Sequence, residues 1–331
     1  MPTIPTVLTG ATFVNGLRTA FNQVYKGPTV QGAFLADCMD LGLGSDSRQE
    51  IYGYHETAPY PSYSPYGDTM RFKAFKSKVW TTVNYPYKLG IGWNRFDRND
   101  DKLGDLMAQA MTGANHFLTL PERVLFEIML GSTTLLPAVP TAPDGVAAYY
   151  ATDGDGAARF GVSGGNIISG SGVATGAAIR ADVWSACQRV IAFQDTEGQP
   201  LFEPTVADHV VLVYNSDNEA VVREAVTQGR TLAAAVTATS NAAVTNTILE
   251  SGKRIDLWGT QRLRGTNDMF AFFPKAPYKP FYRQTRDPVT ETFHTYDNSD
   301  HAALTDEEWV QWVGRDGYGV GPCYGTVKID N

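Results

Sequence analysis

The longest regular pattern in this chain is helical. Between residues 101 and 131, apolar side chains recur every three or four positions, and the pattern stays in phase across Pro121. Because two unrelated helices would not share one phase, the pattern predicts a single long helix with a kink at the proline. At ~1.5 Å per residue such a helix would span about 45 Å, which is long for a compact domain built from a chain of this size.

The part of the chain before this helix is predicted to form an arm and a hairpin. Residues 1–50 are largely irregular, with one short amphipathic helix over 12–25. Residues 51–93 are rich in Tyr and Pro and then alternate apolar with polar side chains, which is typical of strands. We interpret this stretch as a long β-hairpin, with returning strands over 79–83 and 88–93. It is too extended to bury both of its faces by itself.

The part after the helix is predicted to contain an α/β lobe. Residues 132–177 form a Gly-, Pro- and Ala-rich connection, and helical spacing resumes at Ile179. A run of Val and Leu over 209–214 suits a strand that is buried on both faces. Ser216 and Glu219 then have the spacing of a capping box, which would open the next helix.

The last third of the chain is predicted to be rich in strands. Two strands, over 254–257 and 269–273, would complete the lobe. Four more follow Pro274, over 281–284, 289–293, 309–313 and 324–329. The pattern therefore predicts a mixed α+β chain without internal repeats.

The composition excludes some functions and favours others. The 331 residues include 27 basic and 35 acidic side chains, a net charge of −8, which argues against a protein that works by neutralising phosphates. Charged residues make up 19%, below the ~25% of an average soluble domain. Aromatic residues reach 11%, and aromatics are enriched where surfaces meet partners. The composition favours a protein that hides much of its surface against partners.

Neither a membrane span nor a disulfide framework is predicted. The two long uncharged tracts, 160–179 and 231–249, are interrupted by glycines or are rich in Thr and Asn. Cys38, Cys187 and Cys323 are odd in number and widely scattered, so we expect three reduced thiols and no zinc knuckle.

The search for catalytic and metal-binding motifs is negative. Residues 161–165 match the letters of a G-x-S-x-G nucleophile elbow, but no hydrophobic strand precedes them and no helix follows directly. The carboxylates of residues 97–101 suit a solvated helix start better than a cation site. None of the five histidines has the spacing of a metal site. They are His55, His116, His209, His294 and His301. We predict that the chain is not an enzyme and uses no cofactor or metal; a hydrolase based on Ser163 is the alternative from that class.

Four motifs, in this order, resemble those of the major head subunit of Mu-like tailed phages, a family with the Hong Kong 97-type capsid fold. They are residues 91–104 (IGWNRFDRNDDKLG), residues 121–131 (PERVLFEIMLG), residues 279–288 (KPFYRQTRDP) and residues 309–324 with Arg315, Gly317 and Gly319. The likeness runs with gaps from about Tyr52 to the C-terminus. The long, Gly-rich connection 132–177 and the Ala- and Thr-rich tract 228–247 depart from the family's pattern.

The resemblance implies a fold and a division of the chain. The expected fold is α+β, with an N-terminal arm, an extended hairpin called the E-loop, a spine helix in a peripheral P domain, and an inserted α/β axial or A domain. The expected parts are 1–50 (arm), 51–95 (E-loop and flanking strands), 96–176 (P domain, spine helix about 101–131), 177–273 (A domain) and 274–331 (return strands of the P domain).

The resemblance also implies a function and partners. The chain would be a structural major capsid protein that assembles as hexamers and pentamers into an icosahedral head around double-stranded DNA, touching the DNA without sequence specificity. Its partners would include a portal protein, a separate scaffold protein and a decoration protein. It would assemble in the host bacterial cytoplasm and reside in the virion. An encapsulin-like shell and a tail or baseplate protein are the alternatives.

Several residues are candidates for contacts between subunits. Aromatic and basic side chains of the hairpin and of the return strands could anchor a neighbour or pair with its carboxylates. The candidates are Tyr52, Tyr54, Tyr63, Tyr66, Arg71, Lys73, Lys76, Lys78, Trp80, Arg98, Arg283, Arg286 and Arg315. In some relatives a hairpin lysine forms a covalent cross-link, for which Lys73, Lys76 or Lys78 would be placed.

Overall fold

The computed structural model describes residues 10–26, 33–55, 77–96, 103–195, 197–227, 230–232, 243–245, 251–296 and 298–331. Its α-helices are α1 (Gly10–Tyr25), α2 (Ala33–Cys38), α4 (Leu103–Leu130), α5 (Gly176–Ile191), α6 (Glu219–Thr227) and α8 (Asp300–Thr305). Its strands are β1 (Met39–Gly44), β2 (Gln49–His55), β3 (Ser77–Val83), β4 (Tyr85–Asn94), β5 (Ile167–Ser169), β6 (His209–Asn215), β7 (Arg230–Leu232), β8 (Ala243–Thr245), β9 (Arg254–Thr260), β10 (Met269–Phe272), β11 (Phe281–His294), β12 (Glu307–Val320) and β13 (Thr326–Asp330).

The long helix is confirmed as one element. Helix α4 has 28 residues and continues through Pro121. Its N-terminal half packs with α1 against β4 and β12, whereas its C-terminal half joins a second core with α2, β6 and β10. A proline inside a helix costs about 3 kcal/mol, and burial on both sides of Pro121 offsets this cost. Gly131, with φ of 67°, follows the last turn in the left-handed conformation that ends many helices.

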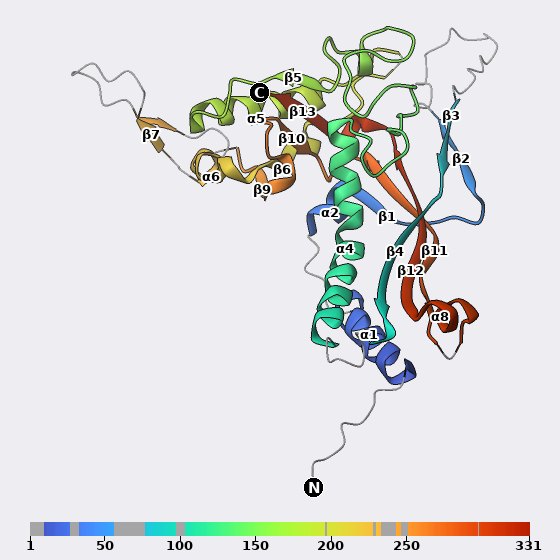
Figure 1. The fold of residues 1–331 in the computed structure, drawn as a ribbon. Helices are drawn as coiled ribbons and strands as arrows, with labels where there is room; N and C mark the ends of the chain where they lie inside the picture. Colours follow the sequence, from blue (N-terminus) through green and yellow to red (C-terminus); the bar gives the residue numbers. More distant parts are fainter. Residues whose placement is uncertain are drawn as a thin grey trace, which may run out of the picture.

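A four-stranded sheet runs beside helix α4 (Figure 1). Its strand order is β1-β11-β12-β4, in which β1 runs parallel to β11 and the other neighbours are antiparallel. Helix α1 covers one face, where Phe21 stacks on Trp312 with ring centroids 4.4 Å apart and Phe13 meets Trp93 edge-on. Helix α8 lies at the far end of the β11–β12 ribbon.

Two strand predictions for this sheet are corrected. The predicted strands 281–284 and 289–293 are one strand, β11, because the chain absorbs Pro288 in a register shift between Asp287 and Thr290. The predicted returning strand 88–93 lies in β4, which pairs with β12 and not with the hairpin. Strand β4 therefore belongs to the four-stranded sheet. This sheet, the five-stranded sheet described next and the helices packed on them are called the body of the molecule.

A five-stranded sheet with the order β5-β13-β10-β6-β9 forms the second layered unit. Strand β6 is buried on both faces, as its run of Val and Leu predicts. Helices α5 and α6 cover one face, while the C-terminal half of α4 and helix α2 pack against the other. The α/β lobe expected from the sequence is therefore present.

The capping box predicted before α6 does not form. The side chain of Asn215 accepts the backbone N–H of Asp217 at 3.1 Å, and a short 3-10 turn over Ser216–Asn218 precedes the helix. The carboxylate of Glu219 instead accepts the hydroxyl of Tyr214 and pairs with Arg223. The helix was predicted correctly, but Asn215 caps the 3-10 turn before it, and Ser216 does not cap the helix through Glu219.

Candidate assembly site at the root of the hairpin

The hairpin of β2 and β3 stands apart from both large sheets (Figure 1). The two strands pair antiparallel from Gln49 with Val83 to His55 with Ser77, and they form a two-stranded sheet of their own. The predicted hairpin is thus confirmed for its described part. Because a lone two-stranded hairpin is marginal in water, its attachment to the body decides where it points.

One row of polar contacts attaches the hairpin to β11. The hydroxyl of Tyr52 donates to Oε1 of Gln284 at 2.5 Å. Nε1 of Trp80 donates to the hydroxyl of Tyr282 at 2.6 Å, and this hydroxyl also bonds to that of Thr82. Tyr52 additionally stacks on Trp80, with ring centroids 5.7 Å apart. Each strand of the hairpin is therefore tied to β11 by directional hydrogen bonds.

A second row continues from Gln284 into the turn between β1 and β2. Nε2 of Gln284 donates to Oδ1 of Asn84 at 2.8 Å, and Nδ2 of Asn84 donates to Oγ of Ser45 at 2.6 Å and to the carbonyl of Ser47 at 2.7 Å. Oε1 of Glu50 then accepts both hydroxyls and the N–H of Ser47. These hydrogen bonds lower the pKa of Glu50.

Glycines on β12 leave room for this hydrogen-bond network. Gly317 lies opposite Gln284, and a Cβ there would come within 2.6 Å of the Gln284 amide nitrogen and 2.7 Å of Oδ1 of Asn84. Gly319 lies opposite Tyr282, and a Cβ there would overlap the phenol ring. The two glycines let Tyr282 and Gln284 lie flat across β12 and reach the hairpin.

Burial raises the pKa of two tyrosines in this hydrogen-bond network, whose ordinary pKa already lies above neutral pH. It raises the pKa of Tyr52 to about 12, and it also raises the pKa of Tyr282. Both hydroxyls therefore keep their protons at neutral pH, and the hydroxyl of Tyr52 can donate to Gln284 there.

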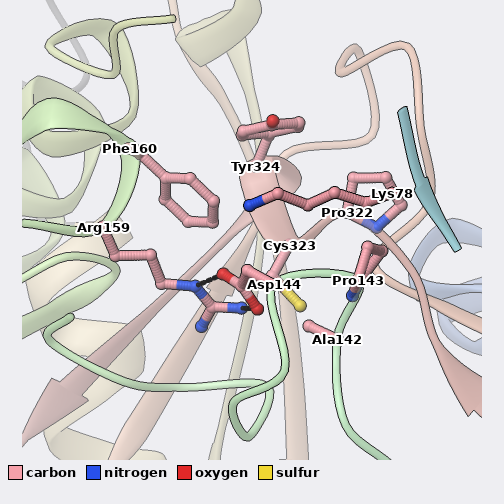
Figure 2. A pocket seen from close by; sticks show the side chains of 9 residues that line it. All are labelled: Lys78, Ala142, Pro143, Asp144, Arg159, Phe160, Pro322, Cys323 and Tyr324. Carbon is pink, nitrogen blue, oxygen red and sulfur yellow. Dashed lines mark hydrogen bonds and ion pairs between the residues drawn. The ribbon is translucent and has the colours of Figure 1, made fainter. Parts of the chain in front are cut away.

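The hairpin has a second contact with the body, on the side of the five-stranded sheet. Figure 2 shows the Lys78 side chain crossing Pro322 so that its amine ends beside the rings of Phe160 and Tyr324. These rings lie 4.7 Å apart and line one small cavity of about 40 Å³ with Lys78. Lys78, a predicted contact residue, thus touches the body of its own chain.

A buried arginine supports the wall of this cavity. Arg159 is 1% exposed and holds Asp144 in a bidentate pair, with N–O distances of 2.6 and 3.1 Å (Figure 2). Its Nη1 donates to the carbonyls of Ala147 and Ala148 at 3.0 and 2.9 Å. Through these bonds Arg159 fastens the connection that follows α4.

Arg283, a candidate for pairing with a neighbour's carboxylate, has a carboxylate partner in its own chain. Its guanidinium pairs with Asp316 on the neighbouring strand at 2.6 Å, and the Asp316 side chain is fully buried. Desolvation raises the pKa of Asp316 despite this pair. Since Arg283 already has a carboxylate partner in its own chain, reversing its charge would damage the subunit itself.

Arg286 and Arg315 lie farther along the same ribbon. Nη1 of Arg286 and Nε of Arg315 are buried and donate to no acceptor among the described residues. Nη1 of Arg315 lies 3.9 Å from Oδ2 of Asp287, which is 59% exposed. Both arginine side chains are partly exposed, and their contact with another subunit stays a prediction.

Other predicted contact residues lie outside the described residues. These are Tyr63, Tyr66, Arg71, Lys73, Lys76 and Arg98, together with the side chain of Tyr54. Of the aromatic candidates that are described, Tyr52 and Trp80 face β11 of their own chain. The exposed face of the hairpin instead presents Ile51 and Val79, which are 68% and 63% exposed.

No catalytic or metal centre is evident in the described part of the chain. Ser163 is exposed in a turn between a 3-10 turn and the three-residue strand β5, so the strand-to-helix geometry of a nucleophile elbow is absent there. Within the described ranges no group of three or more His, Cys, Asp or Glu could hold a metal ion. The three cysteines are buried and free. None of the described helices is both long and apolar enough to cross a bilayer.

Sequence reasoning missed the residues that matter most at the hairpin root. Asn84 and the side-chain roles of Tyr282 and Gln284 were not predicted, although Tyr282 and Gln284 lie within the motif at 279–288. The available signal was the pair Gly317 and Gly319, because glycines inside a strand often mark a close approach by another group.

The arrangement of helices and strands in this chain is similar to that in solved phage structures. No family model matches the chain, and no curated protein matches it. A solved structure from Mycobacterium phage Cain matches with a TM-score of 0.56 and 12% identity, over 98% of this chain and 98% of that one. The mature capsid of bacteriophage PhiM1 matches with a TM-score of 0.55 and 10% identity, over 92% of this chain and 88% of that one. The capsid of cyanophage P-SCSP1u matches with a TM-score of 0.53 and 13% identity, over 92% and 91%.

The chain has a phage capsid fold. The mixed α+β architecture of the Hong Kong 97 type, which the motifs predicted, is confirmed. At 10–13% identity these likenesses establish the fold alone. The narrower likeness to Mu-like head subunits stays a prediction.

Proposed function

We propose that this chain is a non-enzymatic major capsid protein that assembles as hexamers and pentamers into an icosahedral shell around double-stranded DNA. The observation that carries the proposal is the match of 92% of the chain to a subunit of a mature phage capsid, which it covers over 88% of its length. A likeness that spans both chains leaves little room for an added catalytic domain.

The shape of the subunit supports the proposal. A shell needs heterologous contacts that close by rotation, and extended elements bury more area between neighbours than a compact body can. The two-stranded hairpin projects from the body, and β11 and β12 extend beside β4 as far as α8 (Figure 1). The hairpin carries Ile51 and Val79, which are 68% and 63% exposed, on the face turned away from its own chain.

The charge of the chain also supports a role around DNA. A net charge of −8 would keep packaged DNA from adhering to the wall, since a basic wall would bind phosphates. Contact with DNA would then be general and without sequence preference.

The proposal includes the parts and partners that the sequence predicts. The arm would cover 1–50, the E-loop 51–95, the P domain 96–176 and 274–331, and the A domain 177–273. A portal protein, a separate scaffold and a decoration protein would complete a virion of the Mu-like type, assembled in the bacterial cytoplasm. Arg286, Arg315 and the outer face of the hairpin are the described surfaces that we propose for contacts between subunits.

The test is electron microscopy of the purified recombinant protein, alongside size-exclusion chromatography. We expect closed shells, or rings with five and six subunits. Fibres or stacked rings would contradict the proposal and favour a tail protein. Shells that enclose protein cargo in the producing cell instead of DNA would favour an encapsulin-like role.

A further inference from the structure

The hairpin leaves the body at two points that lie side by side. Strand β1 passes into β2 through the turn 45–48, and β3 passes into β4 through Asn84. The backbone N–H of Asn84 donates to the carbonyl of Arg48 at 2.9 Å, and its side chain bonds to Ser45 and Ser47. The two connections are thus hydrogen-bonded to each other at the root of the hairpin.

Beyond these connections, the described part of the hairpin is held to the body by side-chain contacts. Strands β2 and β3 pair only with each other among the described strands. On one side the hairpin is tied to Tyr282 and Gln284 of β11, and on the other Lys78 reaches the wall formed by Phe160 and Tyr324 (Figure 2). A hydrogen bond weakens steeply when its angle changes, so the hydrogen bonds to Tyr282 and Gln284 resist rotation more than an apolar contact would.

We propose that the hairpin is a hinged arm that the hydrogen bonds of the Tyr282–Gln284 row lock at one angle, with the Lys78 contact as a minor support. Loss of the Tyr282–Gln284 row frees the arm to swing about Asn84 and the turn 45–48. Because a swinging arm would reach a neighbour at variable angles, the lock would also set the curvature of the shell, a consequence that rests on the proposed function.

The test measures the angle in the unassembled subunit. Spin labels are placed at two exposed positions through Val79→Cys on the hairpin and Thr292→Cys on β11. The native cysteines are buried, so the labels attach to the introduced thiols. Labelled chain is diluted with unlabelled chain and isolated as subunits by size exclusion, and the distance between labels is measured by pulsed electron paramagnetic resonance.

The variant that releases the lock is Tyr282→Phe combined with Gln284→Ala. It removes the hydroxyl that binds Trp80 and Thr82 and the amide that binds Tyr52 and Asn84. The matched control is Tyr85→Phe, which deletes a hydroxyl from a tyrosine that is 41% exposed just beyond the hinge. Gly319→Ala is a second route, because its methyl group would displace the ring of Tyr282. Thermal unfolding confirms that each variant is folded.

One narrow distance is expected for the parent and for Tyr85→Phe, and a broad or shifted distribution for the double variant and for Gly319→Ala. An unchanged narrow distance in the folded double variant would overturn the lock. In assembled particles, we expect the double variant to lose the uniform diameter of the parent shells. Uniform diameters would refute the link to curvature, whereas a parent chain that forms no shells would refute the proposed function and leave the distance test intact.

Discussion

At the scale of single residues, Arg159 is a charged side chain that is almost completely buried. A guanidinium that is 1% exposed is favourable only when its donors are matched, and Arg159 finds Asp144, two carbonyls and the side chain of Asn166. Replacing it with Leu leaves the Asp144 carboxylate without its partner. We expect Arg159→Leu to lower the free energy of unfolding by about 3–5 kcal/mol in urea titrations of the subunit.

A matched control separates this effect from the general loss of a charge. Arg223 forms a helical pair with Glu219 but is 62% exposed, and exposed pairs contribute below about 1 kcal/mol. Arg223→Leu should therefore change stability little. Arg159→Lys should fail to restore stability, because an ammonium cannot reproduce the planar bidentate fork. Equal losses for Arg159→Leu and Arg223→Leu would contradict this account.

Glu50 makes the turn beside the hairpin sensitive to acid. Hydrogen bonds from Ser45 and from the Asp46–Ser47 segment lower its pKa below the ordinary 4.5. Because the folded pKa is depressed, the stabilisation is present above pH 4.5 and is lost as pH falls through the folded pKa. We expect the amides of Asp46 and Ser47 to lose hydrogen-exchange protection over that range.

The control for this prediction is Glu50→Gln, which cannot titrate. In this variant, the backbone amides of Asp46 and Ser47 should be less protected from hydrogen exchange at neutral pH than in the parent. Their protection should change little further on acidification below pH 4.5. A parent protein whose turn amides stay equally protected on both sides of that range would contradict the role given to Glu50.

At the scale of elements, the contact of α4 with the four-stranded sheet depends on a glycine. A Cβ at Gly113 would overlap Cδ2 of Leu89 on β4, although alanine is favoured over glycine in helices by about 1 kcal/mol. We expect Gly113→Ala to destabilise the parent but to stabilise a Leu89→Ala background, where the overlap is gone. A double-mutant cycle by thermal unfolding measures this change of sign. The same sign in both backgrounds would contradict the close contact.

The elements divide into those that local sequence determines and those that it cannot. Helix α4 was predictable because its apolar spacing is written into consecutive residues, and β6 because a run of Val and Leu fits a doubly buried strand. Pro288 misled the prediction for β11. Strand β1 pairs with β11 only as far as Thr285, so the edge at Pro288 needs no backbone donor and the strand continues.

The root of the hairpin could not have been derived from local pattern. Tyr52 and Gln284, which bond to each other, are 232 positions apart in the chain. Arg283 looked like a free surface cation because its partner, Asp316, lies on another strand. Spacing within a segment indicates which face is apolar, whereas the partner of a polar side chain depends on how distant strands are placed in register.

At the scale of the whole molecule, the exposed apolar face of the hairpin has no partner of its own chain among the described residues. Ile51 and Val79 lie on the side opposite Tyr52 and Trp80, which are bound to the body. An isolated exposed side chain needs no explanation, but two branched apolar residues on an arm that projects from the body suit contact with a neighbouring subunit. We expect Ile51→Glu with Val79→Glu to abolish shells in electron micrographs, because two carboxylates would be desolvated at the contact.

The matched variant is Ile51→Thr with Val79→Thr, which keeps the branched shape and the strand preference without adding charge. It should assemble with at most a weaker yield, and both double variants should melt at similar temperatures as isolated subunits because the face is solvent-exposed in each. If the glutamate variant forms shells as the parent does, the outer face of the hairpin is not buried between subunits. The contacts that close the shell would then have to come from the β11–β12 ribbon, where Arg286 and Arg315 are the next residues to reverse.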